Sequence, residues 1–375
     1  MKNVERIIIK VGSSSIVTSN GQFNHDFISK LISTISLLMK NKIDVVLVTS
    51  AAIAVGMSKL GLDKKPKEMA LKQACAALGQ ASLMNEYEKY TSMDNILCAQ
   101  ILVNHDDFEN RHRMINLSNT FEALFENKVL PIVNENDALS VDEIKVGDND
   151  TLSSLLVQIV KADMLVLVSD IDGLYDKNPK LYSDAKKIDV VEKIDTTIEN
   201  MATGATTNVG TGGMATKIKA GIIANTAGCD MVIISNDDID KINDLLDGKN
   251  IGTLFKKDEK TLKSKEHWII FNTYSKGHIT IDSGASQAVK ERKSLLASGI
   301  KKVIGEFESG SVVIIKDENN NILGKGITNF SSSEIKLVIG KQNNDVKKIL
   351  NSSKDEIVHA SMIVLIEGNE YGKVK

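Results

Sequence analysis

IIIKVGSSSI, at residues 7–16, places three isoleucines directly before a lysine, a glycine and three serines. A continuous apolar run that ends in glycine and small polar residues is typical of a buried parallel strand. From 27 to 38 apolar residues recur at helical spacing, and a second strand-like run follows at 45–48. This order of strand, helix and strand predicts an α/β fold with a parallel sheet that is covered on both faces.

The same alternation continues through the first two-thirds of the chain. Further strand-like runs lie at 96–103, 129–133, 164–168 and 231–234, and helical patterns at 66–92, 116–127 and 151–160. Beyond Phe255 a polar, lysine-rich segment leads to short β-rich runs at 279–281, 312–315 and 362–366. We therefore predict an α/β domain followed by a small, mainly β, barrel-like domain.

The composition is that of a globular protein. The 375 residues carry a net charge of -3, which excludes a strongly basic, polyanion-binding chain. Cys75, Cys98 and Cys229 lie far apart, so we expect reduced thiols and no disulfide framework. The N-terminal apolar run is too short for a signal peptide, and no stretch approaches the ~20 apolar residues of a membrane span. We therefore expect a cytoplasmic protein without a membrane partner.

The glycine-rich stretch NVGTGGMATKIKA, at 208–220, admits several interpretations. It matches the dinucleotide pattern G-x-G-x-x-A, but the polar residues before it do not form the strand that this pattern requires. The Walker A string G-x-x-x-x-G-K-[ST] does not occur in the chain. Two interpretations remain: a mobile surface loop, or a phosphate cradle in which glycine N–H groups approach an anion and Lys217 neutralises its charge.

Two strand ends carry a lysine or small residues. Lys10 ends the first strand, where its ammonium group either meets an anion or extends to the surface. The second strand leads into LVTSAAIAVG at 47–56. Small residues at this edge suit either a ligand that touches the backbone or close packing of a helix on the sheet.

Two further strand ends carry acidic and amide side chains. Asp170 and Asp172 follow the strand at 164–168 and would bind metal, ribose or nothing. The segment 131–156 holds more polar groups than a helix N-cap needs, so they would bind an ammonium group or hold basic catalytic residues. They are Asn134, Glu135, Asn136, Asp137, Asp148, Asn149 and Asp150.

Together these segments resemble the amino acid kinase family, and within it the members that phosphorylate glutamate. The resemblance covers almost all of the chain and rests on IIIKVGSSSI, LVTSAAIAVG, KQACAALGQ, PIVNENDA, IKVGDNDTLS, SDIDGLYDKNP and GTGGMATKIKA, in this order. ITIDSGASQAV, SLLASGIKKVIGEFESGSVVII and ILGKGITNFSS resemble the PUA domain that many of these kinases carry. The resemblance implies a three-layer α/β sandwich with a mainly parallel central sheet at 1–258. It also implies a linker at 259–274, a PUA domain at 275–358 and a C-terminal strand or tail at 359–375.

The resemblance also implies a reaction and its residues. ATP, with Mg²⁺ on its phosphates and no metal-binding residue assigned, would phosphorylate the γ-carboxylate of L-glutamate in the first step of proline biosynthesis. Lys10 and Lys217 would flank the transferring phosphoryl group, and Asp150 would hold both lysines. The glutamate-binding residues would be Ser50, Ala51, Asn134, Asp137, Asp148 and Asn149. The ATP-binding residues would be Lys10, Gly12, Ser169, Asp170, Thr211, Gly212, Gly213, Met214, Ala215, Thr216 and Lys217. A carboxylate is already a nucleophile, so this chemistry needs positive charge and N–H donors but no general base.

Ala51 departs from the resemblance, because these kinases usually have glycine in this turn. A positive φ would strain alanine, whereas helical backbone would not. Since a helical pattern begins at Ala51, we predict helical backbone and no strain.

The resemblance further implies proline as a feedback inhibitor, a homo-oligomer (dimer or tetramer) and the next enzyme of the pathway as a candidate partner. Residues 276–375 hold 15 Lys and Arg against 12 Asp and Glu. This excess is too small for binding along a nucleic-acid backbone, so we expect no specific RNA binding. The alternatives are a related kinase for aspartate, acetylglutamate or a nucleoside monophosphate, and an RNA-binding protein.

Overall fold

The computed structural model describes residues 4–18, 20–139, 149–179, 181–203, 213–259 and 261–366. The chain divides into two compact units, Met1–Leu262 and Lys263–Lys375. The segment 259–274, expected as a linker, contains a short helix α11 (Ser264–His267) and a π-helix η2 (Trp268–Asn272). No helix among the described residues is long and apolar enough to cross a membrane.

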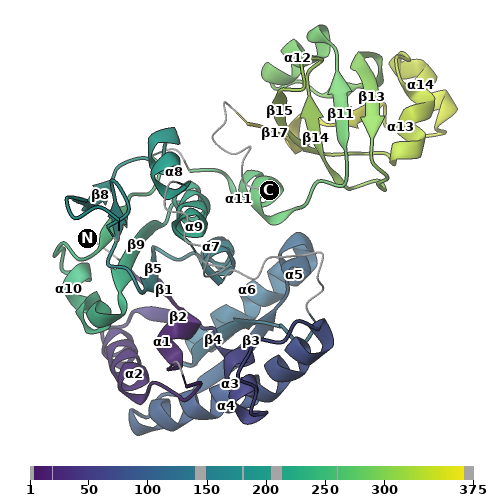
Figure 1. The fold of residues 1–375 in the computed structure, drawn as a ribbon. Coiled ribbons are helices and arrows are strands. Elements are labelled where there is room, and N and C mark those ends of the chain that lie inside the picture. The colour runs from purple at the N-terminus through teal and green to yellow at the C-terminus, as the bar shows by residue number, and fades with distance from the viewer. Residues whose placement is uncertain are drawn as a thin grey trace. The chain divides into compact units, whose positions relative to one another are not determined.

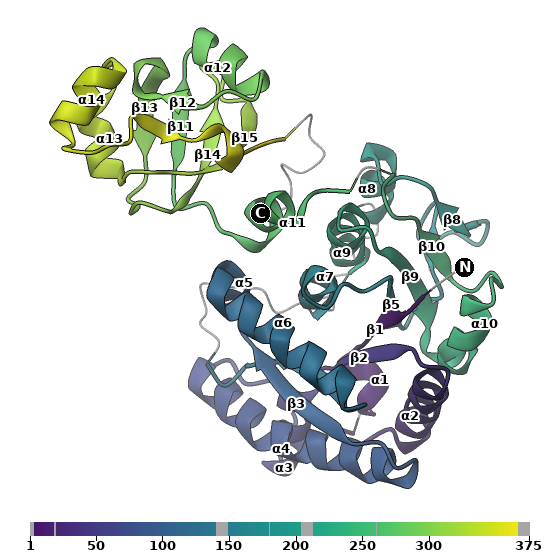
Figure 2. The same cartoon turned by 180° about the vertical axis from the view of Figure 1, so that it is seen from behind.

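The first unit is built on an eight-stranded sheet in the order β3-β4-β2-β1-β5-β9-β10-β8. Figure 1 labels its strands except β10, which is labelled in Figure 2. Every neighbouring pair is parallel except β9 and β10. The strands are β1 (Arg6–Val11), β2 (Asp44–Val48), β3 (Cys98–Val103), β4 (Leu130–Glu135), β5 (Met164–Ser169), β8 (Val190–Val191), β9 (Asp230–Ser235) and β10 (Thr253–Phe255). A small antiparallel pair, β6 (Leu174–Tyr175) and β7 (Lys187–Ile188), lies outside this sheet. The predicted mainly parallel sheet is confirmed.

Helices cover both faces of this sheet and make the first unit a three-layer sandwich (Figure 2). One group packs around α2 (His25–Lys40) and contains α1 (Ser13–Ile16), α3 (Ala52–Lys59), α4 (Met69–Met93), the 3-10 helix η1 (Asn236–Lys241) and α10 (Ile242–Leu246). The other group packs around α7 (Asn149–Val160) and contains α5 (His105–Glu109), α6 (Arg111–Glu126), α8 (Thr196–Thr203) and α9 (Met214–Thr226).

Apolar spacing explains how strand β1 and helix α2 build the core. Ile7, Ile8 and Ile9 are fully buried, as a parallel strand covered on both faces requires. Most apolar residues of α2 lie on one side of the helix and are also buried, whereas Leu37 is exposed. Asn24 begins this helix, and its side chain accepts a hydrogen bond from the backbone N–H of Phe27.

Helices α3 and α4 approach each other backbone to backbone through two glycines. A Cβ atom added to Gly56 would lie 1.9 Å from the carbonyl oxygen of Cys75. One added to Gly79 would lie 1.8 Å from the carbonyl oxygen of Ala52. No side chain fits at either position, so the contact fixes where α3 begins after β2.

The second unit has a core of its own. Its sheets are a five-stranded one, in the order β13-β11-β14-β15-β17, and a two-stranded one of β12 and β16. Its strands are β11 (His278–Ile281), β12 (Leu295–Leu296), β13 (Ile300–Ile304), β14 (Val312–Lys316), β15 (Ile322–Ile327), β16 (Glu356–Val358) and β17 (Ile363–Leu365). Its further helices are α12 (Ser283–Lys290), η3 (Ala297–Gly299), α13 (Ser332–Val338), α14 (Asn343–Ile349) and η4 (Ala360–Met362). Alternate residues of β11 and β14 point into this core, among them Ile279, Ile281, Val313 and Ile315. The predicted small, mainly β domain is confirmed, and β17, from the expected tail, pairs with β15.

Candidate active site

The carboxyl ends of β1, β2, β4 and β5 meet at one edge of the first sheet. In the sheet, β2 lies on one side of β1 and β5 lies on the other. The direction in which successive strands are added therefore reverses at β1. Open parallel sheets bind ligands at such a reversal. A cavity of about 570 Å³ lies at this edge.

The cavity gathers most of the predicted site residues. Those that line it are Lys10, Gly12, Ser50, Ala51, Asn134, Asp137, Asn149, Ser169, Asp170 and Lys217. Asp150 is fully buried next to it, and Gly213, Met214, Ala215 and Thr216 lie at the start of α9. Asp148, Thr211 and Gly212 lie outside the described residues.

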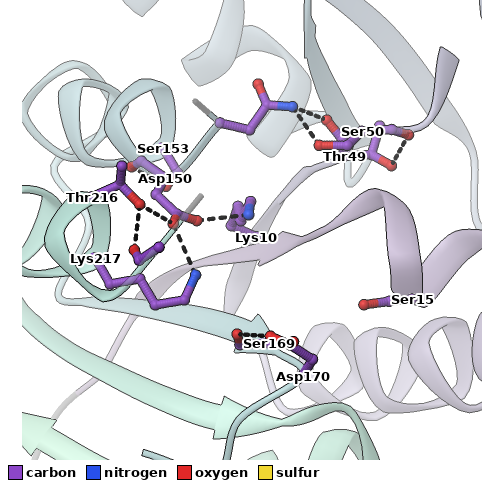
Figure 3. A network of polar contacts seen from close by, with 12 residues as sticks. Lys10, Ser15, Thr49, Ser50, Asp150, Ser153, Ser169, Asp170, Thr216 and Lys217 are labelled. Atoms are coloured by element: carbon purple, nitrogen blue, oxygen red, sulfur yellow. Dashed lines mark hydrogen bonds and ion pairs between the residues drawn. The ribbon is translucent and has the colours of Figure 1, made fainter. Parts of the chain in front are cut away.

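Lys10, Asp150 and Lys217 form a charged triad at the centre of the site (Figure 3). The Nζ atom of Lys10 lies 2.6 Å from Oδ1 of Asp150, and that of Lys217 lies 2.9 Å from Oδ2. The Thr216 hydroxyl donates a hydrogen bond of 3.3 Å to Oδ2. All three charged residues are buried, with exposed fractions of 8%, 0% and 5% in chain order. Two positive charges thus share one carboxylate, and the excess charge favours an anion in the cavity.

The electrostatics of Asp150 depend on the two lysines. Burial by itself raises the pKa of the Asp150 carboxyl, but the Lys10 and Lys217 ammonium groups outweigh burial and lower that pKa below its ordinary value. Asp150 is therefore ionised at neutral pH and keeps both lysine side chains in place.

A second polar network joins the ends of β2 and β4 to the start of α7. The Asn149 amide donates to Ser50 Oγ at 2.6 Å and to the Thr49 carbonyl oxygen at 2.8 Å. The Asn134 amide donates to Gln80 Oε1 at 2.9 Å, which ties the network to α4. These bonds hold the polar groups of this side of the cavity in one arrangement.

On the other side of the triad, Ser169 and Asp170 form a separate polar pair at the end of β5. Ser169 donates a hydrogen bond of 3.1 Å to Asp170 Oδ1. Figure 3 shows Lys10 of the triad with Thr49 and Ser50 on one side and Ser169 and Asp170 on the other. The register agrees, because β1 pairs with β2 along one edge and with β5 along the other.

Ala51 corrects one prediction from the sequence. Its backbone has φ 85° and ψ -1°, which is left-handed, so the predicted helical backbone is wrong at this residue. The α-helix begins at Ala52, and Ala51 is its N-cap. The chain must turn sharply from β2 into a helix whose position is fixed by its glycine contacts with α4. Alanine in this conformation is strained, by roughly 1 kcal/mol relative to glycine.

Some cavity residues were missed by the sequence analysis. Ser13, Ser14, Ser15, Ala52, Ile53 and Ala54 fall in stretches that had been singled out, Met57 directly follows one of them, and Val168 lies at a strand end. Glu135, which was among the polar residues noted in the segment 131–156, also lines the cavity. Lys65 carried no signal, because it lies in a polar loop between α3 and α4 without a recognisable motif. Burial raises the pKa of the Asp137 carboxyl, and the Lys65 charge opposes this effect.

Comparison with known proteins agrees with this architecture. The model of the amino acid kinase family matches residues 5–235, and that of the PUA domain matches residues 277–350. The chain belongs to the amino acid kinase family. Every residue that lines the cavity falls within the part of the chain that this family model matches.

Several relatives of this amino acid kinase are similar over their whole length. Proteins named glutamate 5-kinase from Thermoanaerobacter sp. (strain X514) and Caldanaerobacter subterraneus subsp. tengcongensis are each 42% identical over 371 residues, or 98% of this chain and 100% of theirs. A glutamate 5-kinase from Methanococcoides burtonii is 40% identical over 97% of this chain and 98% of its own. Among solved structures, a carbamate kinase from Giardia lamblia has a TM-score of 0.49 at 17% identity, over 69% of this chain and 100% of its own. This last likeness is too low to add to the assignment.

Proposed function

We propose that this amino acid kinase transfers the terminal phosphoryl group of ATP to the γ-carboxylate of L-glutamate, the first step of proline biosynthesis. The observation that carries the proposal is the buried triad of Lys10, Asp150 and Lys217 between two separate polar groups. The full-length relatives named glutamate 5-kinase support the choice of acceptor.

The triad suits a reaction in which both reactants are anions. A carboxylate attacks a phosphoryl group without first losing a proton, so the site needs charge stabilisation and no general base. Lys10 and Lys217 would place two ammonium groups beside the transferring phosphoryl group, where positive charge stabilises the transition state. Lysine is suited to this task as a compact charge. Asp150 would position both ammonium groups.

The side of the cavity after β5 would hold ATP. Gly12, Ser169 and Asp170 line it, and α9 begins beside the triad with Gly213 as its N-cap. A Cβ atom at Gly213 would meet no atom of the described residues within 4 Å. The residues fit a triphosphate, because a helix N-terminus and two lysines favour anions.

Mg²⁺ would neutralise phosphate charge when bound with ATP. Within the described ranges, no group of three or more His, Cys, Asp or Glu residues is placed to hold a metal ion. We therefore propose that the phosphate oxygens supply most of the ligands of Mg²⁺.

The side of the cavity formed by the ends of β2 and β4 would hold glutamate. Ser50, Ala51, Asn134, Asp137 and Asn149 line it. Asp137 offers a carboxylate for the substrate ammonium group. Asp148, Thr211 and Gly212, which lie outside the described residues, keep the roles that the resemblance implies.

Regulation and assembly are further parts of the proposal. Proline, a cyclic analogue of glutamate, would compete for the acceptor side of the cavity. The protein would act in the cytoplasm as a homo-oligomer and would pass its labile product to the next enzyme of the pathway. The second unit would then have a structural or regulatory role, without specific binding of RNA.

The test is an ADP-release assay with a panel of acceptors. L-glutamate, L-aspartate, N-acetyl-L-glutamate and UMP are compared at equal concentration with ATP and Mg²⁺. We expect turnover with L-glutamate, a product that hydroxylamine traps as a hydroxamate, and inhibition by added proline. Preferred turnover of another acceptor, or no hydroxamate with glutamate, would refute the proposed reaction. Uninhibited turnover in proline would refute only the regulatory part.

A further inference from the structure

Among the residues that the structure describes, three cationic side chains line the cavity: Lys10, Lys65 and Lys217. Lys10 and Lys217 are held by Asp150 at the centre of the site. Lys65 is exposed and forms no hydrogen bond or ion pair with another residue of the described ranges. It therefore reaches the cavity wall with its charge available for a ligand.

Lys65 and Asp137 line the same cavity. The positive charge of Lys65 acts on the Asp137 carboxyl and opposes the effect of burial on the pKa of that group. The two side chains nevertheless form no ion pair among the contacts of the described residues. The cavity wall thus offers a positive and a negative group near each other that do not neutralise each other by contact.

An α-amino acid carries a complementary pair of charges. Its ammonium and carboxylate groups are attached to the same carbon atom, so they bind best to a negative and a positive group that are close together. If the γ-carboxylate of glutamate faces the triad, as proposed above, the α-ammonium group matches Asp137. The α-carboxylate then needs a cation that the triad does not already use.

We propose that Lys65 binds the α-carboxylate of the amino acid substrate, and that Lys65 and Asp137 together select an α-amino acid as acceptor. This inference rests on the proposed function and names a further binding residue for it. Its place in the fold agrees with an acceptor role. The loop that carries Lys65 leads from α3, which follows β2, whereas the nucleotide would lie after β5 on the other side of β1.

The first test compares Lys65→Met with Lys64→Met. Lys64 is the matched control, since it is an exposed lysine in the same loop and does not line the cavity. For Lys65→Met we expect the KM for L-glutamate to rise about tenfold or more, as the loss of a charged hydrogen bond predicts. The KM for ATP should stay the same, and Lys64→Met should match the wild type in both constants. An unchanged KM for glutamate in Lys65→Met would overturn the inference.

The second test uses two glutamate analogues as competitive inhibitors. Glutarate lacks the ammonium group, and 4-aminobutyrate lacks the α-carboxylate. We expect Lys65→Met to weaken inhibition by glutarate about tenfold and to leave inhibition by 4-aminobutyrate unchanged. Asp137→Asn should weaken inhibition by 4-aminobutyrate and leave inhibition by glutarate unchanged. Equal effects on both analogues would mean that Lys65 acts on the shape or general charge of the cavity, and would overturn the inference.

Failure of the inference can be distinguished from failure of the proposed function. If the wild type releases no ADP with glutamate, the proposed reaction is wrong, and the inference fails with it. If the wild type turns over glutamate while Lys65→Met has wild-type constants, only the role of Lys65 is wrong. Thermal unfolding of each variant should match the wild type, because Lys65 and Lys64 are both exposed.

Discussion

Replacing Ala51, the N-cap residue of α3, by glycine is expected to stabilise the protein. Ala51 adopts a left-handed backbone with φ 85°. Glycine has no Cβ atom and adopts this conformation without steric conflict. The substitution Ala51→Gly therefore relieves strain that the native fold imposes on alanine.

Two opposing terms set the size of this effect. A left-handed backbone costs an L-residue roughly 1–2 kcal/mol, and glycine removes this cost. Glycine also makes the unfolded chain more flexible, which offsets about 0.4–1 kcal/mol of the gain. We expect the free energy of unfolding to rise by about 0.5–1 kcal/mol, which raises the Tm of the first unit by about 1–4 °C.

Ala54→Gly is the matched control for this prediction. Ala54 also lines the cavity, but it lies within α3 and is not among the described residues with positive φ. Glycine at such a helical position costs roughly 0.5–1 kcal/mol. The same chemical change, three residues apart, should therefore shift stability in opposite directions.

Thermal unfolding followed by far-UV circular dichroism measures both variants. Trp268, the sole tryptophan, lies in the second unit, so its fluorescence reports unfolding there separately. A lower Tm for Ala51→Gly, equal to that of Ala54→Gly, would show that the left-handed backbone at Ala51 is not strained and would refute the reasoning.

Three further predictions concern the triad and the second unit. Lys10→Ala and Lys217→Ala should each lower kcat about 10²–10³-fold in a protein that still unfolds cooperatively, and a near-normal kcat would remove that lysine from the mechanism. Asp150→Asn should lower the free energy of unfolding by about 3–5 kcal/mol, because two ammonium groups lose their buried partner. Since the folded-state pKa of Asp150 is lowered, its contribution is present above pH 4 and is lost as the pH falls from about 4 to about 2. Acid titration of wild type and Asp150→Asn should therefore converge at low pH, and parallel curves would contradict this. Residues 1–262 alone should fold and phosphorylate glutamate with altered proline sensitivity or mass, and a monodisperse but inactive fragment would show that the second unit helps to build the site.

Hydrophobic patterning is why much of the fold could be predicted from the sequence. Strand β1, Arg6–Val11, lies where the apolar run before Gly12 predicted a strand, because a parallel strand that is buried on both faces is mostly apolar. The place of the candidate site followed from the same reasoning, since parallel strands bring their carboxyl ends to one edge of the sheet.

Two features of the site could not be predicted because tertiary contacts determine them. The φ angle of Ala51 is set by the docking of α3 on α4 and not by the preference of alanine, which favours a helix. Lys65 precedes a proline in a polar loop, where most lysines face solvent without a partner, and only the folded chain brings it to the cavity. The segment 259–274 was expected to be a linker. Its residues from Trp268 to Phe271 instead form a helical turn that is largely buried, because tertiary packing outweighs the lysines before them.

The close contact between α3 and α4 has a mechanical consequence. With glycine at both crossing points, no flexible side chain lies between the helices to absorb a displacement, so the pair moves as one body. Helix α4 has 25 residues and spans roughly 37 Å. It reaches the acceptor side of the cavity twice, through the hydrogen bond between Asn134 and Gln80 and the bond of 2.6 Å between the Thr49 and Tyr87 hydroxyls.

A displacement of α4 at any point along its length should therefore change the geometry of the cavity where the acceptor binds. The nucleotide side is carried by β5 and α9, which have no such link to this helix among the contacts described above. A molecule or subunit that binds to the outer face of α4 is expected to change the KM for the acceptor and to leave the KM for ATP nearly constant. Measuring both constants in a variant with a bulky residue on that face would decide this, and a matching rise in the KM for ATP would show that the two halves of the cavity move together.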